Sequence, residues 1–243
     1  MLLALLGVLL MISLPFFTKL ASSQYCDIVL AYYLLGTLVC LIFARSKKLT
    51  AFSFLAGLFL GSLSFTKTEA MSACLIIFLL SLPYLFLRGN SLKNQSLLIF
   101  FSFGLCAGIL PTILFEKLYS PLNQTFINGL TSTVKPANLL RMKMILSFLA
   151  IEMVSVKWNG LWMILLAGII LSRGKAFHPT IRIVPIFLFL YLIVVGFYYY
   201  LNTSFDIGWW LKVSLNRILF GILPTVVFWV FYSLIHRDET GDV

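Results

Sequence analysis

Lysine and glutamate side chains stand close together in the stretch Ser64–Met71, which reads SFTKTEAM and connects two apolar runs. Lys67 offers a cation that can bind a phosphate, because charge-assisted hydrogen bonds to phosphate oxygens are strong. Glu69 offers a carboxylate that can act as a general base toward an acceptor hydroxyl or amine. At the end of an apolar run, such a pair suits a lipid headgroup substrate. A lysine at this position can equally extend its charged end to the headgroups without binding a substrate.

Further charged side chains gather near the same predicted membrane surface. Asp27 opens an apolar run in QYCDIVLAYY, where its negative charge also suits the N-terminus of a helix. Glu116 and Lys117 end another run, and Lys212 and Arg217 follow two tryptophans in FDIGWWLKVSLNR. Charged groups next to the hydrocarbon core are costly and usually mark a polar path or a ligand site. The sequence therefore predicts a polar site at one membrane surface.

The elements that position these residues follow from composition. Hydrophobic residues make up 61% of the 243 residues and charged residues only 11%, against about 25% charged residues in soluble domains. The apolar runs are continuous rather than alternating, which predicts an all-α polytopic membrane protein and not a barrel. We attribute the formal charge of +10 to basic loops at the headgroups and expect no nucleic acid partner. The four cysteines lack metal-ligand spacing, so no metal site is expected.

Eight apolar runs predict about eight membrane-spanning helices in one transmembrane domain, residues 1–243. The runs are 2–17, 27–44, 50–66, 70–87, 96–115, 158–172, 184–201 and 218–235. Segments 138–156 and 205–217 mix apolar and charged residues, which predicts interfacial helices on the external face. No association motif of the G-x-x-x-G type stands out beyond chance, and the paired interrupted helices of a transporter are not evident.

Loop lengths predict an orientation for these helices. Short basic linkers follow the second, fourth and sixth runs, and they lie on the same side as both termini. The two sides carry equal numbers of Lys and Arg, but those of the short linkers are packed more densely. The positive-inside rule therefore places the short linkers and both termini in the cytoplasm, and Lys67 and the longer segments outside.

Three stretches resemble motifs of membrane glycosyltransferases of the C superfamily. FLAGLFLGSLSFTKTEAM resembles a small-residue-rich helix that runs into a TK-x-E-G or TKG element at the external surface. YCDIVLAYYLLGTL resembles the Y-A-D element at the start of the preceding span, and WWLKVSLNRILFGILP resembles the stretch W-H-L-x-x-S-L-D-R-L-L…P of bacterial members. The stretches appear in the family's order and rough spacing. Trp210, Asn216 and Ala70 depart from the pattern, which has His, Asp and Gly at these positions.

The resemblance implies an activity and site residues. Similar enzymes, such as dolichyl-phosphate-mannose–protein mannosyltransferases and lipid A aminoarabinose transferases, pass a sugar from a polyprenyl phosphate donor to an external acceptor. Lys67 and Arg217 then match residues that neutralise the donor phosphate, and Asp27 matches an acidic residue at the rim of the cavity. Asp27 and Glu69 are weak candidates for the catalytic base. The family's acidic first external loop has no counterpart here, so the chain reads as the C-terminal portion of such an enzyme, inactive alone if the base lies elsewhere.

Three functional hypotheses stay open at this point. The first is a glycosyltransferase, whole or partial, in a bacterial inner membrane, with membrane lipids and a polyprenyl-phosphate-linked sugar as partners and no certain cofactor. The second is a transporter or flippase of lipid-linked sugars, which predicts polar residues at mid-membrane depth, where the runs contain few. The third is a non-catalytic membrane subunit that docks a partner chain carrying the missing loop. Whether the chain is an enzyme is therefore left open by the sequence.

Overall fold

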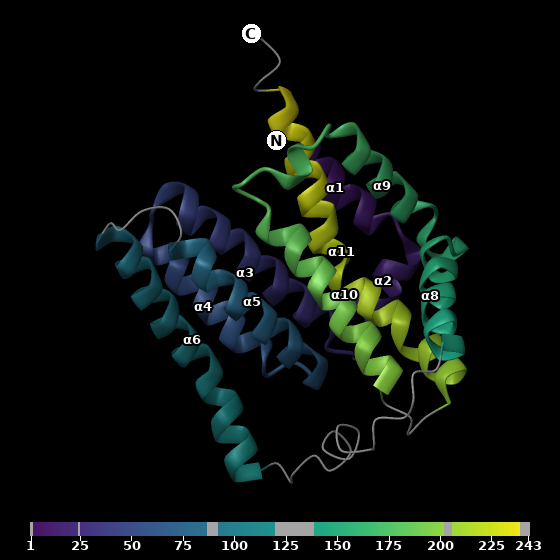
Figure 1. Ribbon diagram of the computed structural model, residues 1–243, viewed down its shortest axis with the longest axis horizontal. Helices are drawn as coiled ribbons and strands as arrows, with labels where there is room; N and C mark the ends of the chain where they lie inside the picture. The colour runs from purple at the N-terminus through teal and green to yellow at the C-terminus, as the bar shows by residue number, and fades with distance from the viewer. Residues whose placement is uncertain (1, 24, 87–91, 120–138, 202–205, 239–243) are drawn as a thin grey trace.

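The computed structural model describes residues 2–23, 25–86, 92–119, 139–201 and 206–238. Within these ranges, the side chains of residues 2–4, 68, 69, 86, 93 and 236–238 lie outside the description. Every regular element in the described ranges is a helix (Figure 1). The prediction of an all-helical protein is confirmed at this level, and the helices are compatible with a membrane protein.

The helices follow the apolar runs along the chain. They are α1 (Leu2–Ile12), α2 (Pro15–Ala21), α3 (Asp27–Lys47), α4 (Thr50–Leu63), α5 (Thr68–Phe86), α6 (Leu92–Tyr119), α8 (Leu139–Met153), α9 (Leu161–Leu171), α10 (Ile183–Leu201) and α11 (Ile207–Asp238). Two short 3-10 helices, η1 (Val156–Trp158) and η2 (Lys175–Phe177), flank α9.

Among the described residues, four helices are long and apolar enough to span a membrane, namely α3, α6, α10 and α11. Helices α4 and α9 are shorter, with 14 and 11 residues. The 14 residues of α4 extend over about 21 Å at 1.5 Å per residue, less than the ~30 Å of a hydrocarbon core. The predicted count of eight spans is therefore not confirmed.

Helix interruptions account for part of this difference. The first apolar run breaks at Leu14, which is extended because it precedes Pro15, and α2 begins at that proline. The sixth run begins as a helix only at Leu161, since Asn159 and Gly160 both have positive φ angles, 45° and 72°. The two breaks meet in space.

The rings of Phe16 and Trp158 lie edge to face, with their centroids 5.0 Å apart, and join the α1–α2 break to the α8–α9 break. A hollow of about 300 Å³ opens beside them. Its lining residues are Pro15, Phe16, Lys19, Val156, Lys157 and Asn159. Two interrupted helical segments thus meet in this fold, although such a pair was not evident from the sequence.

The two predicted interfacial segments have different outcomes. Segment 138–156 contains α8, which is a separate helix. Segment 205–217 is not separate, because α11 runs as one helix of 32 residues from Ile207 through Pro224 to Asp238. The expected boundary between an interfacial helix and the last span is therefore wrong.

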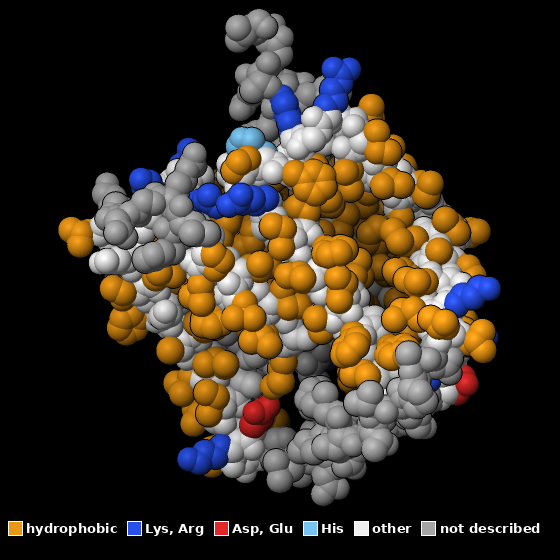
Figure 2. Space-filling model, in the orientation of Figure 1, with side chains coloured by type: hydrophobic (Ala, Val, Ile, Leu, Met, Phe, Trp, Pro, Cys, Tyr) orange, Lys and Arg blue, Asp and Glu red, His pale blue; other side chains and the backbone are white. Residues whose placement is uncertain are grey.

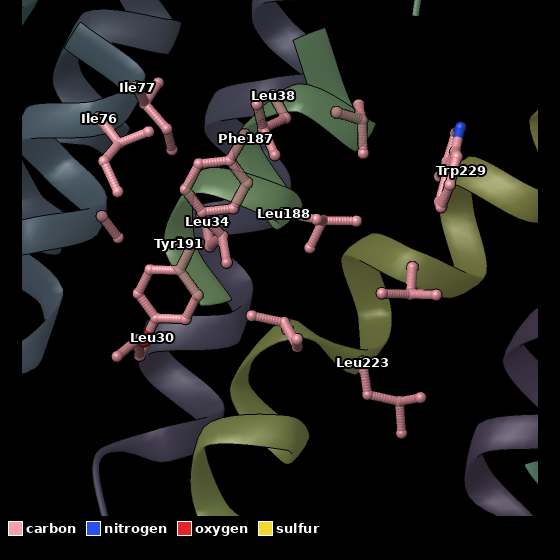
Figure 3. Close-up of a cluster of buried hydrophobic side chains, with 14 of the residues drawn as sticks. Leu30, Leu34, Leu38, Ile76, Ile77, Phe187, Leu188, Tyr191, Leu223 and Trp229 are labelled. Atoms are coloured by element: carbon pink, nitrogen blue, oxygen red, sulfur yellow. The ribbon is translucent and has the colours of Figure 1, made fainter. Parts of the chain in front are cut away.

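Buried side chains of α3, α5, α10 and α11 form the core shown in Figure 3. On α3, Leu30, Leu34 and Leu38 are buried at a spacing of four residues, as on one face of a helix. Phe187 of α10 packs into the same cluster and is fully buried. Asp27 lies on the inward stripe of α3, about one turn before Leu30, so the fold of α3 carries this carboxylate to the interior.

Helices α4 and α6 touch at their backbones. The glycines that permit this contact are Gly57 and Gly61 in α4 and Gly104 and Gly108 in α6. A Cβ built on Gly57 would lie 2.0 Å from the Phe101 carbonyl oxygen, and one on Gly104 would lie 2.0 Å from the Phe54 carbonyl oxygen. Small residues at this spacing let membrane helices pack closely. We call the contact the glycine seam.

Hydroxyl groups extend the glycine seam in both directions. Ser53 Oγ donates to the carbonyl of Leu97 at 2.6 Å, and the hydroxyls of Ser64 and Thr112 are hydrogen-bonded at 2.9 Å. The expectation that no G-x-x-x-G motif stands out is therefore wrong. The signal is a matching pair of motifs, GLFLG and GLCAG, rather than either motif alone.

The start of α1 and the end of α11, which are the described residues nearest the two termini, lie at the same end of the helical bundle (Figure 1). Many of the Lys and Arg side chains visible in Figure 2 gather at this end, and the visible acidic side chains lie toward the opposite end. The linkers that follow α3 and α9 also lie at the end with the termini, whereas the reversal between α4 and α5 lies at the other.

Candidate functional site

Asp27, Lys67 and Arg217 meet at one point of the bundle. Asp27 Oδ1 accepts a hydrogen bond from Lys67 Nζ at 2.9 Å, and Asp27 Oδ2 accepts one from Arg217 Nε at 2.7 Å. The Asp27 side chain is only 3% exposed, while those of Lys67 and Arg217 are 25% and 21% exposed. One buried carboxylate therefore holds two partly exposed cations, and we call these three residues the Asp27 site.

Lys67 is positioned by a tight reversal between α4 and α5. The amides of Ser64, Phe65 and Thr66 each donate to a carbonyl three residues earlier, at 3.1 to 3.2 Å. The carbonyl of Lys67 in turn accepts from the amide of Ala70, in the first turn of α5. Because its neighbours on both sides are held by backbone hydrogen bonds, Lys67 is fixed at the start of α5.

Arg217 is positioned by close packing between α11 and α3. Gly221 lies one turn further along α11, and a Cβ built on it would lie 3.1 Å from Leu30 Cδ2. This close approach brings Arg217 to the first turn of α3, where Asp27 lies. The Arg217 guanidinium also lies over the ring of Tyr25, 3.9 Å from its centroid, in a cation–π contact.

Among the side chains that the structure describes, the Asp27 site carries more positive than negative charge. Its two cations and one carboxylate give a formal sum of +1, and the cations retain exposed area through which a further anion can approach. Arginine and lysine bind phosphate oxygens strongly, arginine through several N–H groups in one plane. Among the described residues, no group of three or more His, Cys, Asp or Glu side chains could hold a metal ion. The arrangement is therefore suited to an anion.

The two candidate bases have different positions. Both oxygens of Asp27 are engaged by cations, and the side chain is buried, so Asp27 is placed to hold Lys67 and Arg217 rather than to take a proton from an acceptor. Glu69 lies in the first turn of α5, but its side chain is outside the described part of the structure. Its assignment as a base stays a prediction.

Trp210, Ala70 and Asn216, which differ from the glycosyltransferase motifs, all have contacts or buried atoms inside the bundle. Trp210 packs edge-on against Tyr199, with ring centroids 4.7 Å apart. Ala70 is fully buried. The Oδ1 atom of Asn216, the neighbour of Arg217 in the chain, is buried and has no hydrogen-bond partner within the described ranges. Asn216 is thus an unmet acceptor in the turn of α11 that carries Arg217.

One group at the Asp27 site was missed by the reasoning from residue types. Tyr25 forms one wall of the Arg217 environment, and its position two residues before Asp27 corresponds to the tyrosine of the Y-A-D pattern, which could have identified it. Arg141 of α8 donates from Nε and Nη2 to the Tyr199 carbonyl, at 3.1 and 2.9 Å. Burial lowers the pKa of Arg141, and the charge of Asp206 opposes this change. Arg141 therefore ties α8 to the end of α10.

Comparisons with known proteins give no family assignment. No protein-family model matches the chain, and neither the curated proteins nor the solved structures contain a significant match. The resemblance to glycosyltransferases of the C superfamily stays a prediction, and the site is interpreted from its own geometry.

Proposed function

We propose that the Asp27 site binds the phosphate of a polyprenyl-phosphate-linked sugar. On this proposal the chain is a membrane glycosyltransferase, or the C-terminal portion of one, that transfers the sugar to an acceptor at the external face. The observation that supports it is the convergence of two cations, 40 and 190 residues away in the chain, on one buried carboxylate. The excess charge sits at the end of apolar helices, where a lipid phosphate with its chain in the membrane arrives.

The proposed reaction is a direct displacement at the anomeric carbon. A lone pair of the acceptor forms the new bond to that carbon while the bond to the phosphate oxygen breaks and its electron pair stays on the phosphate. Lys67 and Arg217 stabilise the charge that builds on the departing lipid phosphate. A carboxylate takes the acceptor proton. Glu69 is the candidate within this chain, and a carboxylate of a partner chain is the alternative.

The proposed location is a bacterial inner membrane with both termini and the short linkers in the cytoplasm. Support comes from the separation of the two ends of the bundle, because the termini lie opposite the reversal that carries Lys67 (Figure 1). Membrane lipids and the lipid-linked sugar are the proposed partners.

Binding of a phosphorylated lipid tests the proposal directly. We would place the full chain in nanodiscs of zwitterionic lipid and titrate polyprenyl phosphate or the corresponding polyprenol. We expect tighter binding of the phosphate form, with affinity about 10- to 100-fold lower in Lys67→Gln and in Arg217→Gln, since each change removes a charge-assisted hydrogen bond.

Lys212→Gln is the matched control, because Lys212 is an exposed cation of the same helix as Arg217. It should leave the affinity within about twofold, as expected for a surface charge. Equal affinity for phosphate and polyprenol, or an equal loss in all three variants, would contradict the proposed site. Release of sugar-free polyprenyl phosphate from the labelled donor, with label appearing on an acceptor, would then establish transfer.

A transporter of lipid-linked sugars is a second candidate, favoured by the meeting of two interrupted helices at Phe16 and Trp158. Discontinuous helices form the substrate sites of many transporters. Lys157, which is paired with Glu152 at 3.1 Å, and Lys19 line the hollow there. In proteoliposomes this candidate predicts translocation of a fluorescent polyprenyl-phosphate sugar that is slower in Lys19→Gln, with no chemical change in the lipid. Sugar transfer without translocation would exclude it.

A further inference from the structure

An arginine and a tyrosine form a stacked pair at the end of the bundle that carries the termini. The guanidinium carbon of Arg45, in the last turn of α3, lies 4.2 Å from the centroid of the Tyr84 ring, near the end of α5. The Tyr84 hydroxyl donates to the carbonyl of Thr180, in the linker before α10. Three segments are thereby held together around the Tyr84 side chain.

A second cation follows the segment that Tyr84 holds. Arg182, exposed at the start of α10, comes two residues after Thr180, whose carbonyl accepts from the Tyr84 hydroxyl. The Arg45 side chain is partly exposed, and that of Arg182 is exposed. Two accessible guanidinium groups beside one tyrosine thus define a place for an anion.

The surroundings of this pair are strongly basic. Further cations stand at the end of α3 and in the segment between α9 and α10, and they are Lys47, Lys48, Arg173 and Lys175. The carboxylates whose side chains the structure describes lie on other segments, and they are Asp27, Glu116, Glu152 and Asp206. Within the described side chains, no carboxylate therefore neutralises Arg45 and Arg182.

An exposed apolar stripe leads away from Arg182 along α10. Its members follow one another at three- and four-residue spacing, and they are Ile186, Phe189, Ile193 and Phe197, at 43%, 66%, 50% and 57% exposure. The amide of Ile186 donates to the carbonyl of Arg182 at 3.3 Å, so the cation directly precedes the helix that carries the stripe. Residues at this spacing form one line on a helix surface. A cation at the start of a line of exposed apolar side chains suits a phospholipid, whose phosphate is charged and whose acyl chain is apolar.

We propose that Arg45 and Arg182 bind the headgroup phosphate of an anionic phospholipid, with an acyl chain along the apolar stripe of α10. The planar donors of two guanidinium groups suit a phosphate held from two directions. The stripe favours a lipid over free phosphate, because free phosphate has no apolar part to occupy it. This lipid site is at the opposite end from the Asp27 site and does not depend on the function proposed for that site.

Lipid binding to the full chain can be measured by native mass spectrometry from detergent micelles. We would titrate phosphatidylglycerol and phosphatidylcholine with identical acyl chains, and compare Arg45→Gln and Arg182→Gln with Lys47→Gln and Lys48→Gln. We expect preferential binding of phosphatidylglycerol, with an association constant about tenfold lower in each arginine variant and nearly unchanged in each lysine variant.

Several outcomes would overturn the lipid site. Equal losses in the arginine and lysine variants would mean that diffuse charge, not this site, attracts the lipid. Equal binding of both lipids, or displacement of phosphatidylglycerol by inorganic phosphate alone, would also overturn it. Arg182 is exposed, so Arg182→Gln should fold even if Arg45→Gln does not, and helix content by circular dichroism checks this.

Phe189→Ser should weaken phosphatidylglycerol binding without changing the preference over phosphatidylcholine, and a changed preference would contradict the role of the stripe.

Discussion

The carboxylate of Asp27 and the guanidinium of Arg217 are 190 residues apart in the chain, and Asp27 Oδ2 lies 2.7 Å from Arg217 Nε. The contact joins the first turn of α3 to α11. Removing a carboxylate from water is expensive, and here two cations, with Tyr25 stacked on one of them, offset that cost. The pair is therefore both a structural link and the centre of the candidate site.

Replacement of Asp27 by asparagine should destabilise the fold. Asn keeps the shape but leaves Lys67 and Arg217 without their anion, and breaking a buried ion pair from one side costs about 3–5 kcal/mol. The measurement is the free energy of unfolding in mixed detergent micelles, followed by circular dichroism. Asp206→Asn is the control, because Asp206 is exposed and Asn can still accept the hydrogen bond from the Trp209 amide. Equal effects of the two changes would contradict the buried link.

Lys67 and Arg217 should act non-additively on stability. Either cation alone leaves Asp27 paired, whereas removal of both leaves a buried carboxylate without a cation. In a cycle of Lys67→Met, Arg217→Met and the double variant, we expect the double variant to lose more than the two single variants together, by about 0.5–3 kcal/mol. Additive losses in unfolding free energy would show that the two cations do not share Asp27 in the membrane.

Two glycine substitutions should have effects of opposite sign. Gly57→Ala places a Cβ 2.0 Å from the Phe101 carbonyl oxygen, so α4 and α6 must separate, at a cost of about 1–3 kcal/mol or more. Gly196→Ala in α10 meets no atom within 4 Å and should gain up to about 1 kcal/mol from helix propensity. Both are measured as shifts in thermal midpoint in detergent. A gain in both variants would mean that the glycine seam is looser than described.

Cysteine labelling should place the two ends of the bundle on opposite sides of the membrane. With Cys40, Cys74 and Cys106 replaced by serine or alanine, the exposed Cys26 reports the end that carries Asp27. In a second protein lacking all four native thiols, Lys48→Cys reports the other end. We expect an impermeant maleimide to label Cys26 in intact cells and the new thiol only after permeabilisation. Labelling of both without permeabilisation would contradict the proposed orientation.

The sequence allowed the local structure to be predicted far better than the contacts between distant segments. The apolar runs located the helices, and the spacing of Asp27, Leu30, Leu34 and Leu38 places the carboxylate on the inward face of α3. Helix ends were less predictable, because the breaks at Leu14 and at Asn159–Gly160 depend on single residues within apolar sequence. The predicted count of eight spans is not confirmed, in part because of these breaks.

Contacts between segments depend on how helices are rotated against one another, and a single sequence does not encode this in any short stretch. The meeting of Lys67 and Arg217 at Asp27 was expected only through a resemblance to known motifs. The glycine seam was overlooked because a single G-x-x-x-G motif is common by chance. Only the two motifs together, one in α4 and one in α6, indicate a close contact between the helices. Tyr25 was overlooked because an aromatic residue at a membrane surface has an ordinary explanation as an anchor.

The order of these residues in the chain has a consequence for biosynthesis. Lys67 follows Asp27 by 40 residues and Arg217 follows it by 190, so a ribosome delivers the lysine long before the arginine. We expect Lys67 to form the ion pair with Asp27 while the nascent protein is being inserted. Arg217 then adds the second ion pair to Asp27 once α11 has been synthesised. Crosslinking between cysteines placed at positions 25 and 66 in chains stalled before α11 would reveal this early pairing, and its absence would show that the pair forms only on completion.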